Sequence, residues 1–237
     1  MSIFDWQFFR GAIPTVLKDG LLNTLNLTIV TFIFACLIGL ITALIKIYKI
    51  PVLYQISLVY VSFFRGTPLL VQILIFYYGL PTILNHYSTE YGWNADISKI
   101  PPIIYMYVVF SLCYGAYISE VMRSAVLSVD KGQHEAAYTI GMSGAKVLRR
   151  IVFPQALSNA LPNLGNYFVD IVKGTSLAFT ATVVEILASA KIIGARDYRY
   201  FEAYLAAALV YWVVCLIFEV LFRTVEKRSR KYERRPA

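Results

Sequence analysis

Charged and metal-binding side chains are scarce in this 237-residue sequence. Charged residues make up 15% of it, and there are two histidines and three cysteines. Neither His86 nor His134 has companions at metal-ligand spacing, so we predict no metal site. The cysteines stand far apart in apolar stretches and are expected to be small buried hydrophobes rather than a disulfide framework. No grouping of His, Ser and Asp side chains indicates an enzyme.

The sequence also lacks a nucleotide-binding loop. No G-x4-G-K-[ST] stretch occurs, and no glycine is followed by a lysine anywhere in the chain. This chain is therefore not a P-loop ATPase, and any energy for its activity must come from a partner or a gradient. We expect it to bind no cofactor of its own.

Apolar residues, by contrast, are abundant. They make up 58% of the chain, and the mean hydropathy of +0.62 lies well to the apolar side of a soluble globular mixture. The net charge is +8, with seven of the 22 Lys and Arg residues in the last fifteen positions. Basic residues at the ends of apolar runs are typical of membrane topology, so we expect membrane lipid around the chain and no nucleic-acid partner.

Five stretches are apolar and long enough to span a bilayer. They run from 22 to 47, from about 55 to 80, from 101 to 123, from about 157 to 180 and from 204 to 222. We predict an all-α integral membrane protein whose residues 1–237 form a single transmembrane domain. Residues 1–20 are expected to be an external interfacial segment, 20–224 a five-span core, and 223–237 a basic cytoplasmic tail.

The distribution of positive charge predicts the orientation. With the N-terminus outside, fourteen of the 22 Lys and Arg residues fall on the cytoplasmic side and six on the outside. The positive-inside rule therefore favours N-out and C-in. The largest cytoplasmic segment, 124–154, then lies between the third and fourth spans.

This cytoplasmic segment contains the stretch HEAAYTIGMSGAKVLRRIVFP. We expect two short helices: a first one ended by Gly141 in a left-handed cap, and a second one capped by Ser143 and ended by Pro154. Ala136 and Ala137 would permit the close approach of another protein, with Glu135 offering a charge. The alternative is a solvated basic loop that only fixes the topology.

The same stretch resembles the EAA loop of ABC importer permeases, EAA-x3-G-x9-I-x-L-P. The residues that match are Glu135, Ala136, Ala137, Gly141, Ile151 and Pro154, with Phe153 where the family usually has Leu. The blocks TLNLTIV, FRGTPLLVQ, AYISEVMRSAV, GQHEAA, RRIVFPQAL and KGTSL resemble the polar amino-acid uptake branch of that family.

The resemblance implies a permease subunit in the bacterial cytoplasmic membrane. It implies a second permease copy or a paralogue as partner, ABC ATPase subunits that hold ATP and Mg, and an extracytoplasmic amino-acid-binding protein. The EAA loop would then be the coupling helix that docks on the ATPase, and the spans would work by alternating access.

A substrate path is predicted from polar groups within the spans. Arg65 precedes a Thr67–Pro68 pair suited to the N-cap and first position of a half-helix, which would favour a carboxylate. The alternative is a packing kink in which Arg65 pairs with Glu120 or Asp170. Glu120 and Arg123 lie one turn apart and could equally form a structural pair.

The fourth span is unusually polar and must line water or lie within a bundle. Its end carries Asp170 and Lys173, followed by Thr175 and Ser176, and the family block usually has Asp where this chain has Gly174. Asp170 is either part of a cavity retuned for another amino acid or simply the neutralising partner of Lys173.

We expect the cargo to be a polar amino acid. L-cystine or a related sulfur amino acid is weakly favoured, with arginine, glutamine and histidine open. The alternative function is a secondary transporter or channel that needs no ATPase; the five spans, the missing inverted repeat and the complete EAA loop speak against it.

Overall fold

The structure, a computed structural model, describes residues 4–92 and 99–229, which contain helices and no strand. The α-helices are α1 (Trp6–Tyr48), α2 (Leu53–Gly66), α3 (Leu69–Leu74), α4 (Leu80–Glu90), α5 (Pro102–Leu127), α6 (Lys131–Thr139), α7 (Gly144–Val147), α8 (Phe153–Gly174), α9 (Ile186–Asp197) and α10 (Tyr200–Ser229). Two π-helical turns, Ile75–Gly79 and Leu148–Val152, join α3 to α4 and α7 to α8, and a 3₁₀ segment, Thr175–Ala181, extends α8.

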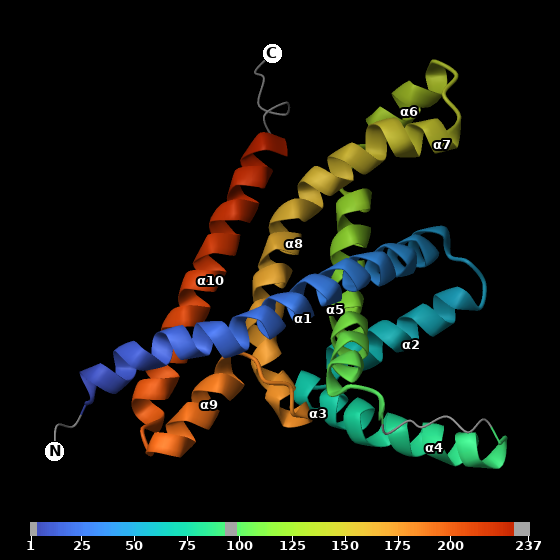
Figure 1. Cartoon of the computed structure of the whole chain (residues 1–237). Coiled ribbons are helices and arrows are strands. Elements are labelled where there is room, and N and C mark those ends of the chain that lie inside the picture. The colour runs from blue at the N-terminus through green and yellow to red at the C-terminus, as the bar shows by residue number, and fades with distance from the viewer. Residues whose placement is uncertain (1–3, 93–98, 230–237) are drawn as a thin grey trace.

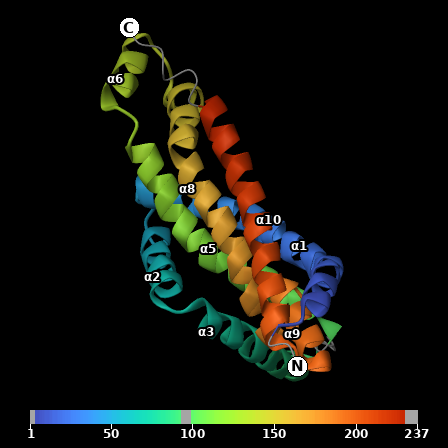
Figure 2. The same ribbon diagram turned by 90° about the vertical axis from the view of Figure 1, so that its left-hand side faces the viewer.

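Three long helices, α5, α8 and α10, run side by side, and α1 crosses them at a steep angle (Figure 1). The loop helices α6 and α7 project at the end where α10 finishes, whereas α4, α9 and the start of α1 lie at the opposite end (Figures 1 and 2). The start of α1 and the end of α10 therefore lie at opposite ends of the molecule, as an odd number of crossings requires.

The number of spans agrees with the prediction of about five. Within residues 4–92 and 99–229, four helices are long and apolar enough to cross a membrane: Trp6–Tyr48, Leu69–Glu90, Pro102–Leu127 and Tyr200–Ser229. The remaining one, fourth in chain order, is a bent pair, Gly144–Ala181 with Ile186–Asp197, which meet at 51°. The protein is thus an all-α membrane protein, although the limits of its spans differ from those expected.

The first helix is much longer than the predicted first span. It includes residues 6–20, so the expected interfacial segment does not end at a helix boundary. Phe9, Ala12 and Val16 are buried in a cluster with residues of α8, α9 and α10. At 1.5 Å per residue, this helix of 43 residues is about 65 Å long. Because that is about twice the thickness of the bilayer core, α1 must be strongly inclined or extend beyond it.

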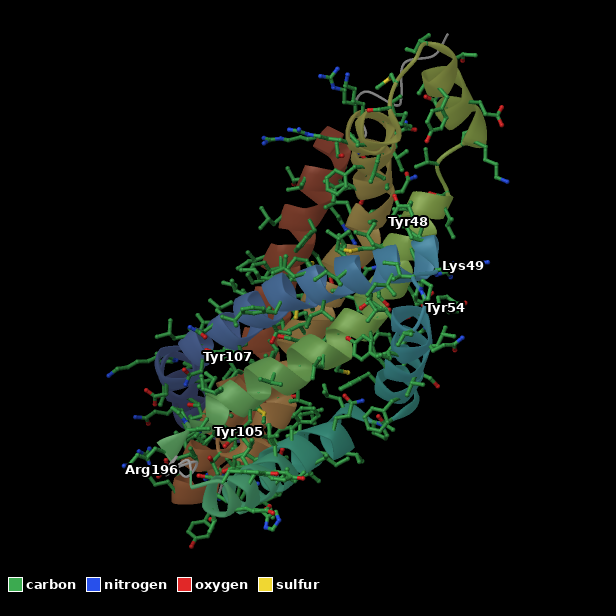
Figure 3. All side chains as sticks on the ribbon, turned by 90° about the vertical axis from the view of Figure 1, so that its right-hand side faces the viewer. Tyr48, Lys49, Tyr54, Tyr105, Tyr107 and Arg196 are labelled. Carbon is green, nitrogen blue, oxygen red and sulfur yellow. The ribbon has the colours of Figure 1, made fainter. Side chains whose placement is uncertain are left out.

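The predicted second span is two separate helices. The chain turns sharply after α1, where Lys49 has a left-handed backbone with φ 49°, and α2 then runs only to Gly66. Figure 3 shows Tyr48 and Lys49 on one side of this turn and Tyr54 on the other. After the break the next helix continues to Glu90, well past the expected end at residue 80.

Two further boundaries were misplaced. The helix α10 extends to Ser229, so the start of the predicted basic tail at residue 223 is helical, and the rest of the tail, 230–237, lies outside the described residues. The helix α9 was not predicted at all. Two of its residues, Ile186 and Ala190, are fully buried and pack in the cluster shared with α1 and α10.

Candidate functional site

One face of α8 carries a stripe of polar side chains. Its members, spaced alternately four and three residues apart, are Asn159, Asn163, Asn166, Asp170 and Lys173. All five are exposed, whereas Leu164, Phe168 and Ile171 on the other faces are buried. Unpaired polar groups in hydrocarbon each cost several kcal/mol. The stripe therefore faces water or another protein chain, as predicted for the fourth span.

Two hollows lie along this stripe, between α8, α5 and the break after α2. The first has a volume of about 410 Å³, and its lining includes Arg65, Tyr117, Glu120, Asn159, Asn163 and Tyr167. The second has a volume of about 470 Å³ and is lined by Thr67, Leu69, Cys113, Tyr114, Tyr117, Tyr167 and Asp170. The hollows adjoin, because Tyr117 and Tyr167, whose ring centroids are 5.8 Å apart, line both.

Arg65 and Glu120 both line the first hollow but do not pair with each other. The Arg65 guanidinium lies over the Tyr117 ring, 5.5 Å from its centroid. Glu120 accepts hydrogen bonds from Lys46 of α1 and from Nε of Arg123, the latter at 3.0 Å. The structure thus contains the Glu120–Arg123 pair, with Lys46 as a third member that the sequence analysis missed.

Asp170 has its own partner as well. Its Oδ1 lies 3.2 Å from Nζ of Lys173, and the two side chains are 54% and 60% exposed. The alternative in which Arg65 pairs with Glu120 or Asp170 is therefore wrong, and Arg65 has no ion pair among the described residues. A pair as exposed as Asp170 and Lys173 is weakly held and available to a third charge.

The non-helical turn between α2 and α3, beside Arg65, leaves the start of α3 without a side-chain cap. Thr67 does not cap it, since its hydroxyl donates back to Phe63 O at 2.8 Å. The N-cap is Pro68, whose ψ of 138° is not helical, so the predicted capping register is wrong by one residue. The buried Gln72 donates to the carbonyls of Phe64, at 2.9 Å, and Thr67, at 3.0 Å, which secures the end of α2.

The residues after Lys173 are less accessible than predicted. Thr175 is fully buried, and its hydroxyl donates to Val172 O at 2.7 Å. Ser176 is half-buried and donates to Lys173 O at 2.7 Å. Neither lines the two hollows, because the 3₁₀ segment turns both hydroxyls back onto their own helix.

The loop beyond the inner ends of α5 and α8 forms a compact helical turn. Gly141 has φ +78°, as expected of a left-handed cap. Its N–H donates to Tyr138 O at 2.9 Å, and the N–H of Met142 donates to Ala137 O at 3.1 Å. This pair of bonds is the Schellman arrangement, which fixes the direction in which α6 ends.

The two alanines of this loop differ in solvent exposure. Ala136 is exposed beside the exposed Glu135, whereas Ala137 is only 2% exposed and packs in the protein's own core. The expectation that both alanines face outwards is therefore wrong. A small residue at 137 lets α6 lie close to Val147 and Leu148 of the next helix.

The second helix of the loop does not end at Pro154. It continues from Gly144 through Pro154 to Ala181 as the fourth span. A proline within a helix removes one N–H and clashes with the carbonyl four residues before it. The π-turn Leu148–Val152 widens the helix just ahead of Pro154, where the N–H of Phe153 donates to Leu148 O, and so accommodates the ring. Ile151 lies in this turn, half-buried against the core.

The loop exposes apolar side chains that the motif alone did not indicate. Ile140 is 78% exposed and Tyr138 is 55% exposed, at the tip that Figure 2 shows projecting from the spans. Exposed apolar groups on a projecting tip are typical of a protein-binding surface. Together with Glu135 and Ala136 they define the docking tip, a name used below for these four residues.

Comparisons with known proteins agree with this geometry. The family described as "Binding-protein-dependent transport system inner membrane component" matches residues 35–231. The chain is 42% identical to the probable amino-acid permease protein YxeN of Bacillus subtilis (strain 168) over 98% of each chain. It is 39% identical to the L-cystine transport system permease protein TcyL of the same organism, over 98% of this chain and 94% of that one.

A solved structure shows the same architecture. One chain of the crystal structure of an amino acid ABC transporter with histidines superimposes with a TM-score of 0.80 and 32% identity, over 95% of this chain and 99% of the other. The chain therefore belongs to the inner membrane components of binding-protein-dependent transport systems, as a permease subunit of an amino-acid ABC transporter.

Proposed function

We propose that this chain, paired with a second permease copy or a paralogue, forms the path of an ATP-driven amino-acid importer in the bacterial cytoplasmic membrane. The polar stripe of α8 carries this proposal. Its five side chains are exposed in a chain whose other long helices are apolar. Only a water-filled path or a facing subunit makes such a stripe compatible with the bilayer.

The second hollow suits the two charges of a free amino acid. The uncapped helix start at Leu69 presents backbone N–H groups, which favour the α-carboxylate. Asp170 on the facing side of the same hollow offers a counter-charge for the α-ammonium group. The Tyr114, Tyr117 and Tyr167 rings would then enclose the side chain of the cargo.

The two adjoining hollows favour a cargo with two amino-acid ends. L-cystine has a carboxylate and an ammonium group at each end, and each hollow contains an acid, Glu120 or Asp170. Arg65 in the first hollow has no carboxylate partner and would receive the second carboxylate. Two relatives, at 39% and 38% identity, are L-cystine transport permeases. Another relative, at 31% identity, is an arginine transport system permease protein, and arginine as cargo would leave the first hollow filled with water.

The docking tip would couple transport to ATP hydrolysis on the partner. In the N-out, C-in orientation it lies in the cytoplasm, where ATPase subunits that hold ATP and Mg can reach it. Glu135 and Ile140 provide a charge and an apolar contact on one projecting turn. The tip is on α6, which packs against α7 and the π-turn after it, and α7 continues into α8. A displacement of the tip would therefore reach the polar stripe through one continuous helix. An external binding protein would deliver the amino acid to the other side.

Competition for transport tests the cargo. The permease is reconstituted with its ATPase and binding protein, and the uptake of radiolabelled L-cystine is measured against an excess of unlabelled arginine, glutamine or histidine. We expect only cystine and related sulfur amino acids to suppress uptake. Uptake of labelled arginine with no cystine uptake would overturn the sulfur amino-acid assignment.

A further inference from the structure

The fourth span is broken at a point that the transport path does not touch. The helix that begins at Gly144 ends at Ala181, and α9 starts at Ile186 with a 51° change of direction. Between them Thr182 has a left-handed backbone, φ 61°, and Glu185 is extended. A break inside a membrane domain leaves backbone N–H and C=O groups without helical partners, and each unsatisfied group is costly there. Here neighbouring helices supply the partners.

The first helix secures one side of the break. Asn23 of α1 donates to Val184 O at 2.7 Å, and the hydroxyl of Thr24 accepts from the N–H of Ile186 at 3.3 Å. Gly20 allows this approach, since a Cβ at that position would lie 2.6 Å from the Cα of Ile186. Contacts this short to backbone atoms leave no room for any side chain, so α1 and the break are in direct van der Waals contact.

Glu185 secures the other side, and it is fully buried. Its carboxylate accepts the N–H groups of Leu187, at 2.9 Å, and Ala188, at 2.7 Å, which are the first orphan donors of α9. It also accepts a hydrogen bond from the Tyr211 hydroxyl of α10. A serine or asparagine cap would satisfy the helix start at a lower desolvation cost. The carboxylate adds a bond to a third helix, which indicates a role in holding helices together.

The contacts that Glu185, Tyr211, Asn23 and Gly20 make around the break are called the brace below. The position of the brace relates it to transport. The helix from Gly144 to Ala181 begins beside α6, which carries the docking tip, and ends at the break, about 55 Å away by helical rise. A flexible break would absorb a displacement that arrives along α8, whereas a rigid one transmits it.

We infer that Glu185 is a positioning residue for transport: with Tyr211, Asn23 and Gly20 it makes the break rigid, so that α1, α9 and α10 move with α8 as one body. The residue touches neither cargo nor ATPase. The inference rests on the chain's place in an ATP-coupled transporter, but it depends on neither the identity of the amino acid nor the residues of the hollows.

Hydrogen–deuterium exchange on the complete transporter tests this directly. In the wild type we expect residues 182–189 to exchange slowly both without nucleotide and with ATP trapped. In Glu185→Ala we expect fast exchange at 182–189 and unchanged exchange at 131–152. Transport per ATP hydrolysed should fall by about tenfold or more, because three bonds to a buried charge are lost, while the ATPase still co-purifies.

Graded variants keep the test decisive if Glu185→Ala does not assemble. Glu185→Gln keeps the shape and one acceptor oxygen, and Tyr211→Phe removes only the bond to α10, so both should give intermediate losses of transport per ATP. Glu202→Gln is the matched control, because Glu202 is a buried acid at the same end that bonds Arg199 and the N–H of Asp5 but not the break. We expect it to transport like the wild type.

Two results would overturn the inference. The first is fast exchange at 182–189 in one nucleotide state of the wild type, which would make the break a hinge. The second is wild-type transport per ATP in both Glu185→Gln and Tyr211→Phe. If uptake stays normal in every variant of the docking tip while exchange at 182–189 is slow, the proposed coupling role of the tip is wrong and the inference about Glu185 still holds.

Discussion

The left-handed turn at Gly141 gives a graded test of the coupling loop. The residue has φ +78°, and nothing lies within 4 Å of the place where a Cβ would stand. A substitution there changes the backbone energy without a steric clash. Gly141→Asn and Gly141→Ala therefore vary one quantity, the cost of the left-handed conformation, whereas Gly141→Pro also removes a backbone N–H donor.

The size of each effect follows from backbone energetics. Alanine costs about 1–2 kcal/mol in a left-handed conformation, and asparagine less. One or two kcal/mol changes a conformational equilibrium by about 5 to 30-fold. Proline fixes φ near −65° and removes the N–H that donates to Tyr138 O at 2.9 Å, so it cannot form this turn. We expect the fraction of protein with a correctly formed loop to fall in the order Gly, Asn, Ala, Pro, with almost none in the proline variant.

Coupling is measured as amino acid transported per ATP hydrolysed in proteoliposomes. We expect a slight loss for Gly141→Asn, an intermediate loss for Gly141→Ala and background transport for Gly141→Pro, while each variant still inserts in the membrane. Wild-type coupling in Gly141→Pro would refute the reasoning, because the docking tip would then not need its turn.

Other substitutions test individual roles. Glu135→Lys reverses the exposed charge of the docking tip, so we expect ATP hydrolysis without uptake; normal uptake would remove this residue from the coupling role. Lys173→Ala deletes a cation of the polar stripe and should lower transport by about tenfold, whereas Lys18→Ala, an exposed cation outside the stripe, should not; equal effects would count against the path. Arg65→Gln should reduce cystine uptake more than arginine uptake in any system that accepts both, and an equal reduction would separate Arg65 from the second carboxylate.

The sequence predicted the number of spans well because long apolar runs report burial in lipid. It could not place helix ends where tertiary contacts decide them. The first span was predicted to begin at residue 22 and the five-span core at residue 20. The helix α1 instead begins at Trp6, and Gly20 within it allows close contact with Ile186. The missed α9 has a similar cause: its N-cap is Glu185, an uncommon capping residue whose role depends on Tyr211 in another helix.

The candidate site was predicted in part. The polar stripe of α8 and the cap at Gly141 follow from local spacing and local backbone preference, so both could be read directly. The partners of Arg65 and Glu120 could not, because Lys46 and Tyr117 reach them across helices. Pro154 was misread as a helix end, since only the structure shows the π-turn that accommodates it.

The most direct test of the whole account is uptake by proteoliposomes that contain the purified permease. Amino-acid uptake is compared with and without the ATPase subunits, the binding protein, and ATP with Mg. We predict uptake only when all of them are present, and none from an ion gradient alone. Uptake by the permease without an ATPase, driven by a gradient, would contradict the central claim that this chain works as the path of an ATP-driven importer.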